Sequence, residues 1–182
     1  MARRSDARDR VLAAVQELVL AGDAAPTFDA IAARSGVSKG GVLHHFRDRG
    51  ALVRGLAERA VSATDEVMTA ASERGDAART WLRMSAAQGP DHQAARAMLS
   101  LMRVEAGGRI ELGHGIDEAV TRWQAMIAAE LGDEVLAAVV RLVGDGLFAA
   151  TLADTVPAPG ELEEIYSRLL GPGPVRTGAE EP

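Results

Sequence analysis

The sequence predicts an all-α protein of about nine helices. Apolar residues recur three and four positions apart in almost every segment, and no segment reads convincingly as a strand. Gly, Pro and Asp residues stand between these segments, where helices commonly begin or end. Of the 182 residues, 47% are hydrophobic, which excludes wholesale disorder.

The first helix is expected to end at Gly22, and Ser5 is a candidate for its N-cap. Its apolar stripe consists of Val11, Leu12, Val15, Leu18 and Val19. Two short helices follow within residues 27–46. Asp48 can then cap a long fourth helix over residues 49–72, before a glycine ends it. The stripe of this fourth helix consists of Leu52, Val53, Leu56, Ala60, Val67, Met68 and Ala71.

The second half continues the helical pattern. Helices around Trp81 and Met98 lead through a Gly-containing loop to a helix with a clean apolar stripe. That stripe consists of Ile116, Val120, Trp123, Ile127 and Leu131. Asp133 can cap a very apolar helix over residues 134–153. A last amphipathic helix carries Leu162, Ile165, Tyr166 and Leu169, and the Gly/Pro-rich residues 171–182 are expected to be disordered.

Charge is distributed unevenly along the chain, whose net value is -6. Residues 1–60 hold ten basic and seven acidic residues, which is +3, and residues 61–182 hold ten and nineteen, which is -9. The acidic total alone would argue against nucleic-acid binding, but the basic excess of the first part restores that option. Lys39 is the only lysine. Arg3 and Arg4 form either an arm for the minor groove or only a polar terminus.

Residues 27–46 carry the most informative pattern, which is a short helix, a glycine turn and a second short helix. Gly36 can adopt the positive φ that ends the first helix, and Val37 can fill the space between the two. The Ser38 hydroxyl can cap the second helix. This arrangement is typical of a helix-turn-helix, whose second helix enters the major groove of DNA with its N-terminus first.

With these residues in this order, the chain resembles the TetR/AcrR family of bacterial transcriptional regulators. The resemblance covers roughly residues 8–60 and rests on Ile31-Ala32, Gly36-Val37-Ser38, the run from Lys39 to Phe46, Arg49 and Leu52. It implies an N-terminal three-helix, helix-turn-helix DNA-binding domain over residues 1–50, a C-terminal helical effector-binding and dimerisation domain over residues 51–170, and a disordered tail over residues 171–182. Such proteins act as homodimers, usually repressors, that leave DNA when a small molecule binds.

The resemblance transfers unevenly to the reading helix. Gly41 and Leu43 stand where the family often has Thr and Tyr, so two hydroxyl donors to phosphate are missing. Arg49 replaces a family Lys and can still clamp a phosphate, and His45 matches a position that often contacts phosphate. Lys39 and His44 could reach base edges. The residues expected to hold DNA are Thr27, Ser38, Lys39, Gly40, Gly41, Leu43, His44, His45 and Arg49.

Two glycines in the reading helix have two interpretations. Gly40 and Gly41 each cost about 1 kcal/mol of helix propensity relative to Ala. They could let the helix lie close to the DNA backbone, or they could be tolerated because neighbouring apolar residues hold the helix in place. Both interpretations can be true together.

Catalytic and metal sites are not predicted. The chain has no G-x-S-x-G, H-E-x-x-H or phosphate-loop motif, and no cysteine. His44 and His45 are adjacent, so on a helix they point about 100° apart and chelate a metal poorly. His92 and His114 are isolated in sequence. We therefore expect no enzyme activity, no metal and no cofactor.

The second half is expected to hold an effector and a dimer interface. An adaptable apolar cavity could be lined by Trp81, Met84, Met98, Met102, Trp123, Met126, Asp145 and Phe148, although core packing is the commoner role for any one of them. Asp145 could also contact a second subunit or lie at a solvated edge. The helix over residues 134–153 is apolar on more than one face, so it should pair with the last helix in a homodimer.

The leading interpretation is a ligand-responsive regulator, a repressor that binds a palindromic operator as a dimer and is released by a small apolar effector. The alternative is a helical DNA-binding regulator controlled by a protein partner, with no small-molecule ligand. No stretch approaches the roughly 18 apolar residues of a membrane helix, and the start lacks the unbroken apolar run of a signal peptide. A soluble, cytoplasmic protein with no membrane partner is expected.

Overall fold

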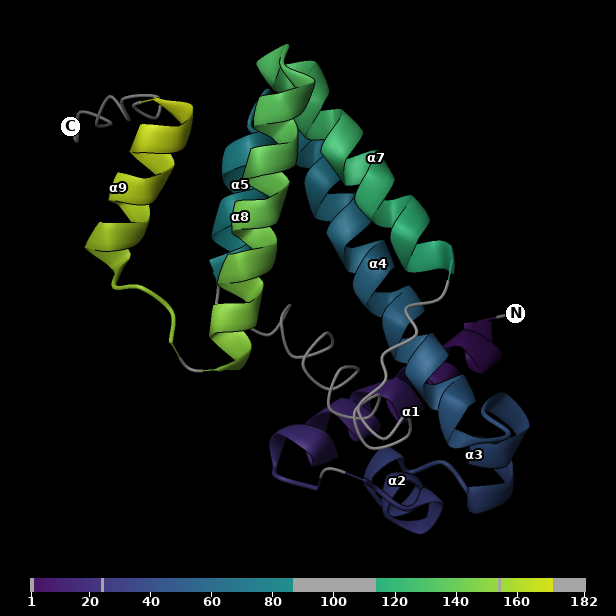
Figure 1. Ribbon diagram of the computed structural model, residues 1–182. Helices are drawn as coiled ribbons and strands as arrows, with labels where there is room; N and C mark the ends of the chain where they lie inside the picture. Colours follow the sequence, from purple (N-terminus) through teal and green to yellow (C-terminus); the bar gives the residue numbers. More distant parts are fainter. Residues whose placement is uncertain (1, 24, 87–113, 154, 172–182) are drawn as a thin grey trace, which may run out of the picture. The chain divides into compact units, whose positions relative to one another are not determined.

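The computed structural model describes residues 2–23, 25–86, 114–153 and 155–171 (Figure 1). Within these residues it contains eight α-helices and no strand, which confirms the all-α class. The helices are α1 (Ala2–Leu20), α2 (Phe28–Ser35), α3 (Lys39–His45), α4 (Arg49–Glu73), α5 (Ala77–Ala86), α7 (His114–Leu131), α8 (Glu134–Leu152) and α9 (Pro159–Leu170). The helix expected around Met98 and the tail after Gly171 lie outside the described residues.

Two compact units make up the chain. The first contains α1, α2, α3, the part of α4 up to Glu66 and the part of α7 up to Thr121. The second contains α4 from Val67, α5, α7 from Arg122, α8 and α9. Because α4 contributes to both units, it is one helix through which the chain passes from one unit to the other.

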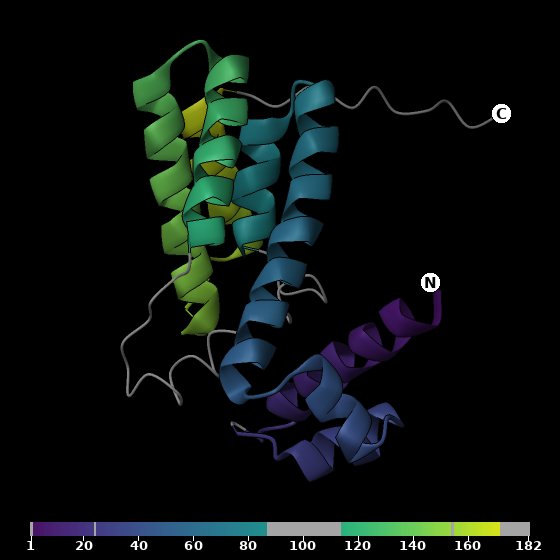
Figure 2. The ribbon, with the colours of Figure 1, turned by 90° about the vertical axis from the view of Figure 1, so that its right-hand side faces the viewer.

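In the first unit, α1, α2 and α3 pack on one another, as Figure 2 shows from a second direction. Its core consists of Val11, Leu12, Val15, Ile31, Val42, Phe46, Leu52 and Leu56. Gly55 allows a close approach within this core, since a Cβ there would lie 2.8 Å from Cε1 of Phe46 and 3.2 Å from Cδ2 of Leu12.

The start of α1 predicted from the sequence was wrong. The helix begins at Ala2, because the Ala and Arg residues before Ser5 are strong helix formers.

The second unit is built on α5, which packs along α8 and also contacts α9. Its buried side chains include Trp81, Leu82, Trp123, Ile127, Val140, Leu147 and Tyr166. Asp133 caps α8 as predicted, because its Oδ1 accepts hydrogen bonds from the N–H groups of Val135 and Leu136, both at 2.9 Å. A carboxylate from α7, that of Glu130, accepts hydrogen bonds from the first N–H groups of α5.

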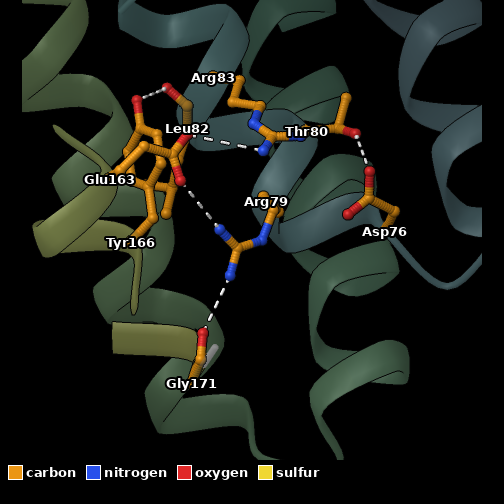
Figure 3. A network of polar contacts seen from close by, with 8 residues as sticks. All are labelled: Asp76, Arg79, Thr80, Leu82, Arg83, Glu163, Tyr166 and Gly171. Atoms are coloured by element: carbon orange, nitrogen blue, oxygen red, sulfur yellow. Dashed lines mark hydrogen bonds and ion pairs between the residues drawn. The ribbon is translucent and has the colours of Figure 1, made fainter. Parts of the chain in front are cut away.

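A polar network joins α5 to α9 (Figure 3). Arg79 is buried, and its guanidinium donates to the carbonyl oxygen of Gly171 at 2.9 Å and pairs with Glu163 at 3.6 Å. The Tyr166 hydroxyl donates to the carbonyl oxygen of Leu82 at 3.2 Å. Burial raises the pKa of Tyr166, and the Glu163 charge acts in the same direction, so the phenol keeps the proton it donates. These bonds supplement the packing of the two helices.

Candidate nucleic-acid interface

The turn between α2 and α3 has the geometry that its residues predict. Gly36 adopts φ 67° and ψ 17°, the left-handed conformation that glycine favours, and its N–H donates to the carbonyl of Ala32. Ser38 then caps α3, because its Oγ accepts a hydrogen bond from the N–H of Gly41 at 3.2 Å. The left-handed glycine and the serine cap are both confirmed, and together they set α3 at an angle to α2.

Thr27 caps the preceding helix in the same way. Its Oγ1 accepts a hydrogen bond from the N–H of Ala30 at 3.1 Å at the start of α2. A capping hydroxyl uses its oxygen as an acceptor and retains its own hydrogen as a donor. The Thr27 and Ser38 hydroxyls therefore keep a donor that could serve a phosphate.

The outward side of α3 presents a short set of chemically different groups. Leu43 is 38% exposed, which is unusual for leucine, and His44 is exposed beside it. Lys39 is exposed and pairs with Asp29 of α2 at 2.9 Å. Exposed ion pairs contribute about 0–1 kcal/mol, so the Lys39 ammonium group could exchange Asp29 for a phosphate or a base edge at little cost. The surface offers a cation, an imidazole and an apolar side chain to a groove.

The two glycines of α3 differ in their surroundings. A Cβ at Gly41 would lie 2.8 Å from Cγ1 of Val37 and 3.2 Å from Oγ of Ser38. A Cβ at Gly40 would meet nothing within 4 Å. Gly41 is therefore explained by packing of the turn onto α3, whereas Gly40 leaves open space on the exposed side of the helix.

Arg49 has partners inside the protein. Its Nη2 donates to the carbonyl oxygen of Ala25 at 3.0 Å and to that of Pro26 at 3.4 Å. These carbonyls belong to the segment that enters α2, so the guanidinium ties the start of α4 to that segment. Sequence reasoning missed Arg47, an exposed arginine in the connection between α3 and α4. The available signal was a basic residue directly after the reading helix.

Seven of the eight effector candidates fall into three groups. Trp81 and Trp123 are both buried, with ring centroids 5.7 Å apart and planes inclined by 36°. Met84, Met126 and Phe148 are half-buried. Met98 and Met102 lie outside the described residues.

Trp81 also lies against α8. Its Nε1 donates to the carbonyl oxygen of Arg141 at 3.3 Å, and Gly144 provides the space for the ring. The structure thus places Trp123 beside Trp81, whose own ring lies on the backbone of α8.

Asp145 has an exposed side chain paired with Arg141 one turn earlier on α8. Burial of part of the carboxyl raises its pKa, and the charge of Arg141 opposes that effect. Arg141 is also held by the Gln124 side chain at 2.8 Å, so the pair connects α8 to α7. The sequence indicated that a buried carboxylate here would need a partner, and Arg141 of the same helix is that partner.

Among the described residues, no group of three or more His, Cys, Asp or Glu side chains is placed to hold a metal ion. In the same part of the chain, no helix combines the length and the apolar character that crossing a membrane requires.

The two capped helices, the left-handed glycine between them and the exposed α3 define a helix-turn-helix regulator. Residues 11–56 match the family model described as bacterial regulatory proteins, tetR family. Residues 75–172 match the model described as tetracyclin repressor-like, C-terminal domain. The chain belongs to the tetR family of DNA-binding transcriptional regulators. Searches of curated proteins and of solved structures gave no significant match.

Proposed function

We propose that this regulator is a repressor that binds a palindromic operator as a homodimer and is released by a small apolar effector. The observation that carries the DNA-binding half is the capped turn from α2 to α3, which leaves Lys39, Leu43 and His44 exposed on one short helix. In this proposal Lys39 and His44 read base edges and Leu43 contacts a thymine methyl group. Thr27, Ser38 and His45 position the helix by contacts to phosphates.

The proposed operator is tested with the DNA upstream of the protein's own gene. Binding of a labelled duplex from this region is measured by fluorescence anisotropy against a mixed-sequence duplex of the same length. The expected result is preference for one palindromic site, with the preference retained as salt is raised. Salt-sensitive binding that is equal for both duplexes would remove the operator from the proposal.

A face of α8 supports the proposed dimer. Val135, Val139 and Leu142 are 75%, 41% and 58% exposed, and their spacing places them along one side of the helix. Large apolar side chains gathered on an exposed helix face are typical of a protein–protein contact. We propose that this stripe packs against α8 and α9 of a second copy, about a two-fold axis.

Light scattering coupled to size-exclusion chromatography tests this contact. Leu142→Glu would place a carboxylate in the centre of the interface and should convert a dimer to a monomer. The control is Leu43→Glu, which also adds a charge at an exposed leucine but lies in α3. If Leu142→Glu stays dimeric, the α8 interface is wrong.

The effector is proposed to act through a two-state equilibrium. Binding in the second unit would favour a dimer in which the two α3 helices no longer match successive major grooves, about 34–36 Å apart. The helix α4 would carry this change, because it runs from the first unit into the second.

Tryptophan fluorescence separates this mechanism from control by a protein partner. Both tryptophans lie in the second unit, so an apolar effector should change their emission and raise the melting temperature. A broad panel of apolar compounds that changes neither would favour the protein partner.

A further inference from the structure

The basic side chains of the first unit are largely engaged within the protein. The described contacts are Arg8 with Glu58 at 2.6 Å, Arg10 with Asp6 at 3.8 Å, Arg34 with Glu17 at 2.5 Å, Lys39 with Asp29 at 2.9 Å, Arg49 with two carbonyls, and Arg59 with the Asp9 carbonyl at 3.5 Å. Among the basic side chains of residues 6–60, all of which but residue 24 are described, only Arg47 and Arg54 have neither an ion pair nor a side-chain hydrogen bond. Both are exposed.

Arg47 is the one of these two that adjoins the reading helix. It directly follows Phe46, the C-cap of α3, and precedes Asp48. The carboxylate of Asp48 accepts a hydrogen bond from the N–H of Ala51 at 2.7 Å, so it caps α4 and is not paired with its neighbour. An exposed guanidinium in this place has no internal partner to leave before it meets DNA.

Arg49 differs from Arg47 in each of these respects. It is half-buried, and two carbonyl oxygens of the segment entering α2 accept its hydrogen bonds. Taking it to a phosphate would leave those partly buried carbonyls without their donor, and a buried acceptor without a partner is unfavourable. Arg47 carries no such cost.

We propose that Arg47 is the residue that clamps a DNA phosphate beside α3, and that Arg49 is a positioning residue that holds the segment entering α2. This assignment rests on the proposed DNA-binding function and changes the expectation that placed the clamp at Arg49. A guanidinium suits the role because its planar fork can donate two parallel hydrogen bonds to one phosphate.

The salt dependence of binding gives the expected size of the effect. Each phosphate contact contributes about 0.9 to the slope of log K against log salt concentration, so two Arg47 side chains in a dimer contribute about 1.8. If variants converge near 1 M salt, this slope corresponds to a loss of about 60-fold in affinity near 0.1 M salt. The loss should be the same for any sequence, because phosphate contacts carry no sequence information.

The test measures anisotropy of a labelled mixed-sequence duplex of about three helical turns, over about 50–200 mM KCl. Arg47→Ala is compared with wild type and with Arg54→Ala, which removes the same charge from an exposed, unpaired arginine one turn into α4. The expected result is a slope lower by about 1.8 for Arg47→Ala and a much smaller change for Arg54→Ala. Arg49→Ala should keep the wild-type slope but melt at a lower temperature.

Each outcome decides a different claim. Slopes lowered equally in Arg47→Ala and Arg54→Ala would mean that only net charge matters, and this overturns the assignment. A slope that falls for Arg49→Ala and not for Arg47→Ala would return the clamp to Arg49. If the wild-type protein binds neither this duplex nor the DNA upstream of its own gene at any of these salt concentrations, the proposed function itself fails. If the wild type binds DNA but its slope is unchanged in Arg47→Ala, the function stands and the Arg47 assignment alone is overturned.

Discussion

Substitution of Gly144 by alanine should destabilise the second unit, because Trp81 fills the space where a side chain would begin. A Cβ built at Gly144 would lie 2.0 Å from Nε1 of Trp81 and 2.6 Å from Cδ1. Ordinary contact between heavy atoms is about 3.5–4.0 Å, so the indole must move by about 1.5 Å. The move would also break the hydrogen bond that Nε1 donates to the carbonyl oxygen of Arg141 at 3.3 Å.

The expected change in the free energy of unfolding is the sum of three terms, of which two destabilise the protein and one stabilises it. Overfilling a packed core typically costs about 1–3 kcal/mol. Loss of the indole hydrogen bond adds about 1 kcal/mol. Alanine in a helix interior returns about 1 kcal/mol relative to glycine. The net expectation for Gly144→Ala is a loss of about 1–3 kcal/mol in the free energy of unfolding.

Gly146→Ala is the matched control, since it lies on the same helix and a Cβ there would meet nothing within 4 Å. This variant should gain up to about 1 kcal/mol from helix propensity alone. Chemical denaturation followed by tryptophan fluorescence measures both variants, and the emission of native Gly144→Ala should also shift as Trp81 moves. If the two variants have equal free energies of unfolding and native emission like that of wild type, the argument from packing at Gly144 is refuted.

Three further predictions test other parts of the structure. Asp133→Ala should lower the free energy of unfolding by about 1 kcal/mol, because two N–H groups at the start of α8 lose their acceptor. Chemical denaturation measures this loss, and a free energy equal to that of wild type would show that the cap contributes nothing. Gly41→Ala should be less stable than Gly40→Ala in thermal melts, since a Cβ meets a side chain at 2.8 Å at the first position and nothing within 4 Å at the second; the reverse order would contradict the packing explanation. Burial raises the pKa of Asp145 above its ordinary value of 3.8, so the folded protein holds this proton more tightly than the unfolded chain does. The stability of wild type minus that of Asp145→Asn should therefore fall as the pH rises through and above 3.8, and a difference that grows with pH would show the opposite sign.

The class of the fold and the turn of the candidate site could be predicted from the sequence because they depend on residues close together in the chain. Gly36 ends α2 with its own positive φ. Ser38 and Asp133 cap the helices that follow them, and the N–H groups they accept from lie two or three positions ahead in the chain. The buried stripe of α1 follows from helical spacing alone. The predicted start of α1 at Ser5 was wrong because a cap residue is only one of several signals, and strong helix formers lie before it.

Roles that depend on residues far apart in the chain were decided by tertiary structure. The sequence indicates that Arg47 and Arg49 are both basic residues next to the reading helix. It does not indicate that carbonyls of Ala25 and Pro26 engage one of them and leave the other exposed. The same limit applies to Gly144, whose reason is Trp81, sixty-three positions earlier in the chain.

The sequence by itself therefore determined the helices, the helix-turn-helix and the membership of a family, since local caps, turns and periodicity specify these. Only the tertiary structure decided which cations have internal partners, which glycines are required by packing, and which apolar side chains of α8 stay exposed. The physical reason is that a side chain's free donors and uncovered area depend on every element that packs against it. Those neighbours are set by the fold and not by adjacent positions in the chain.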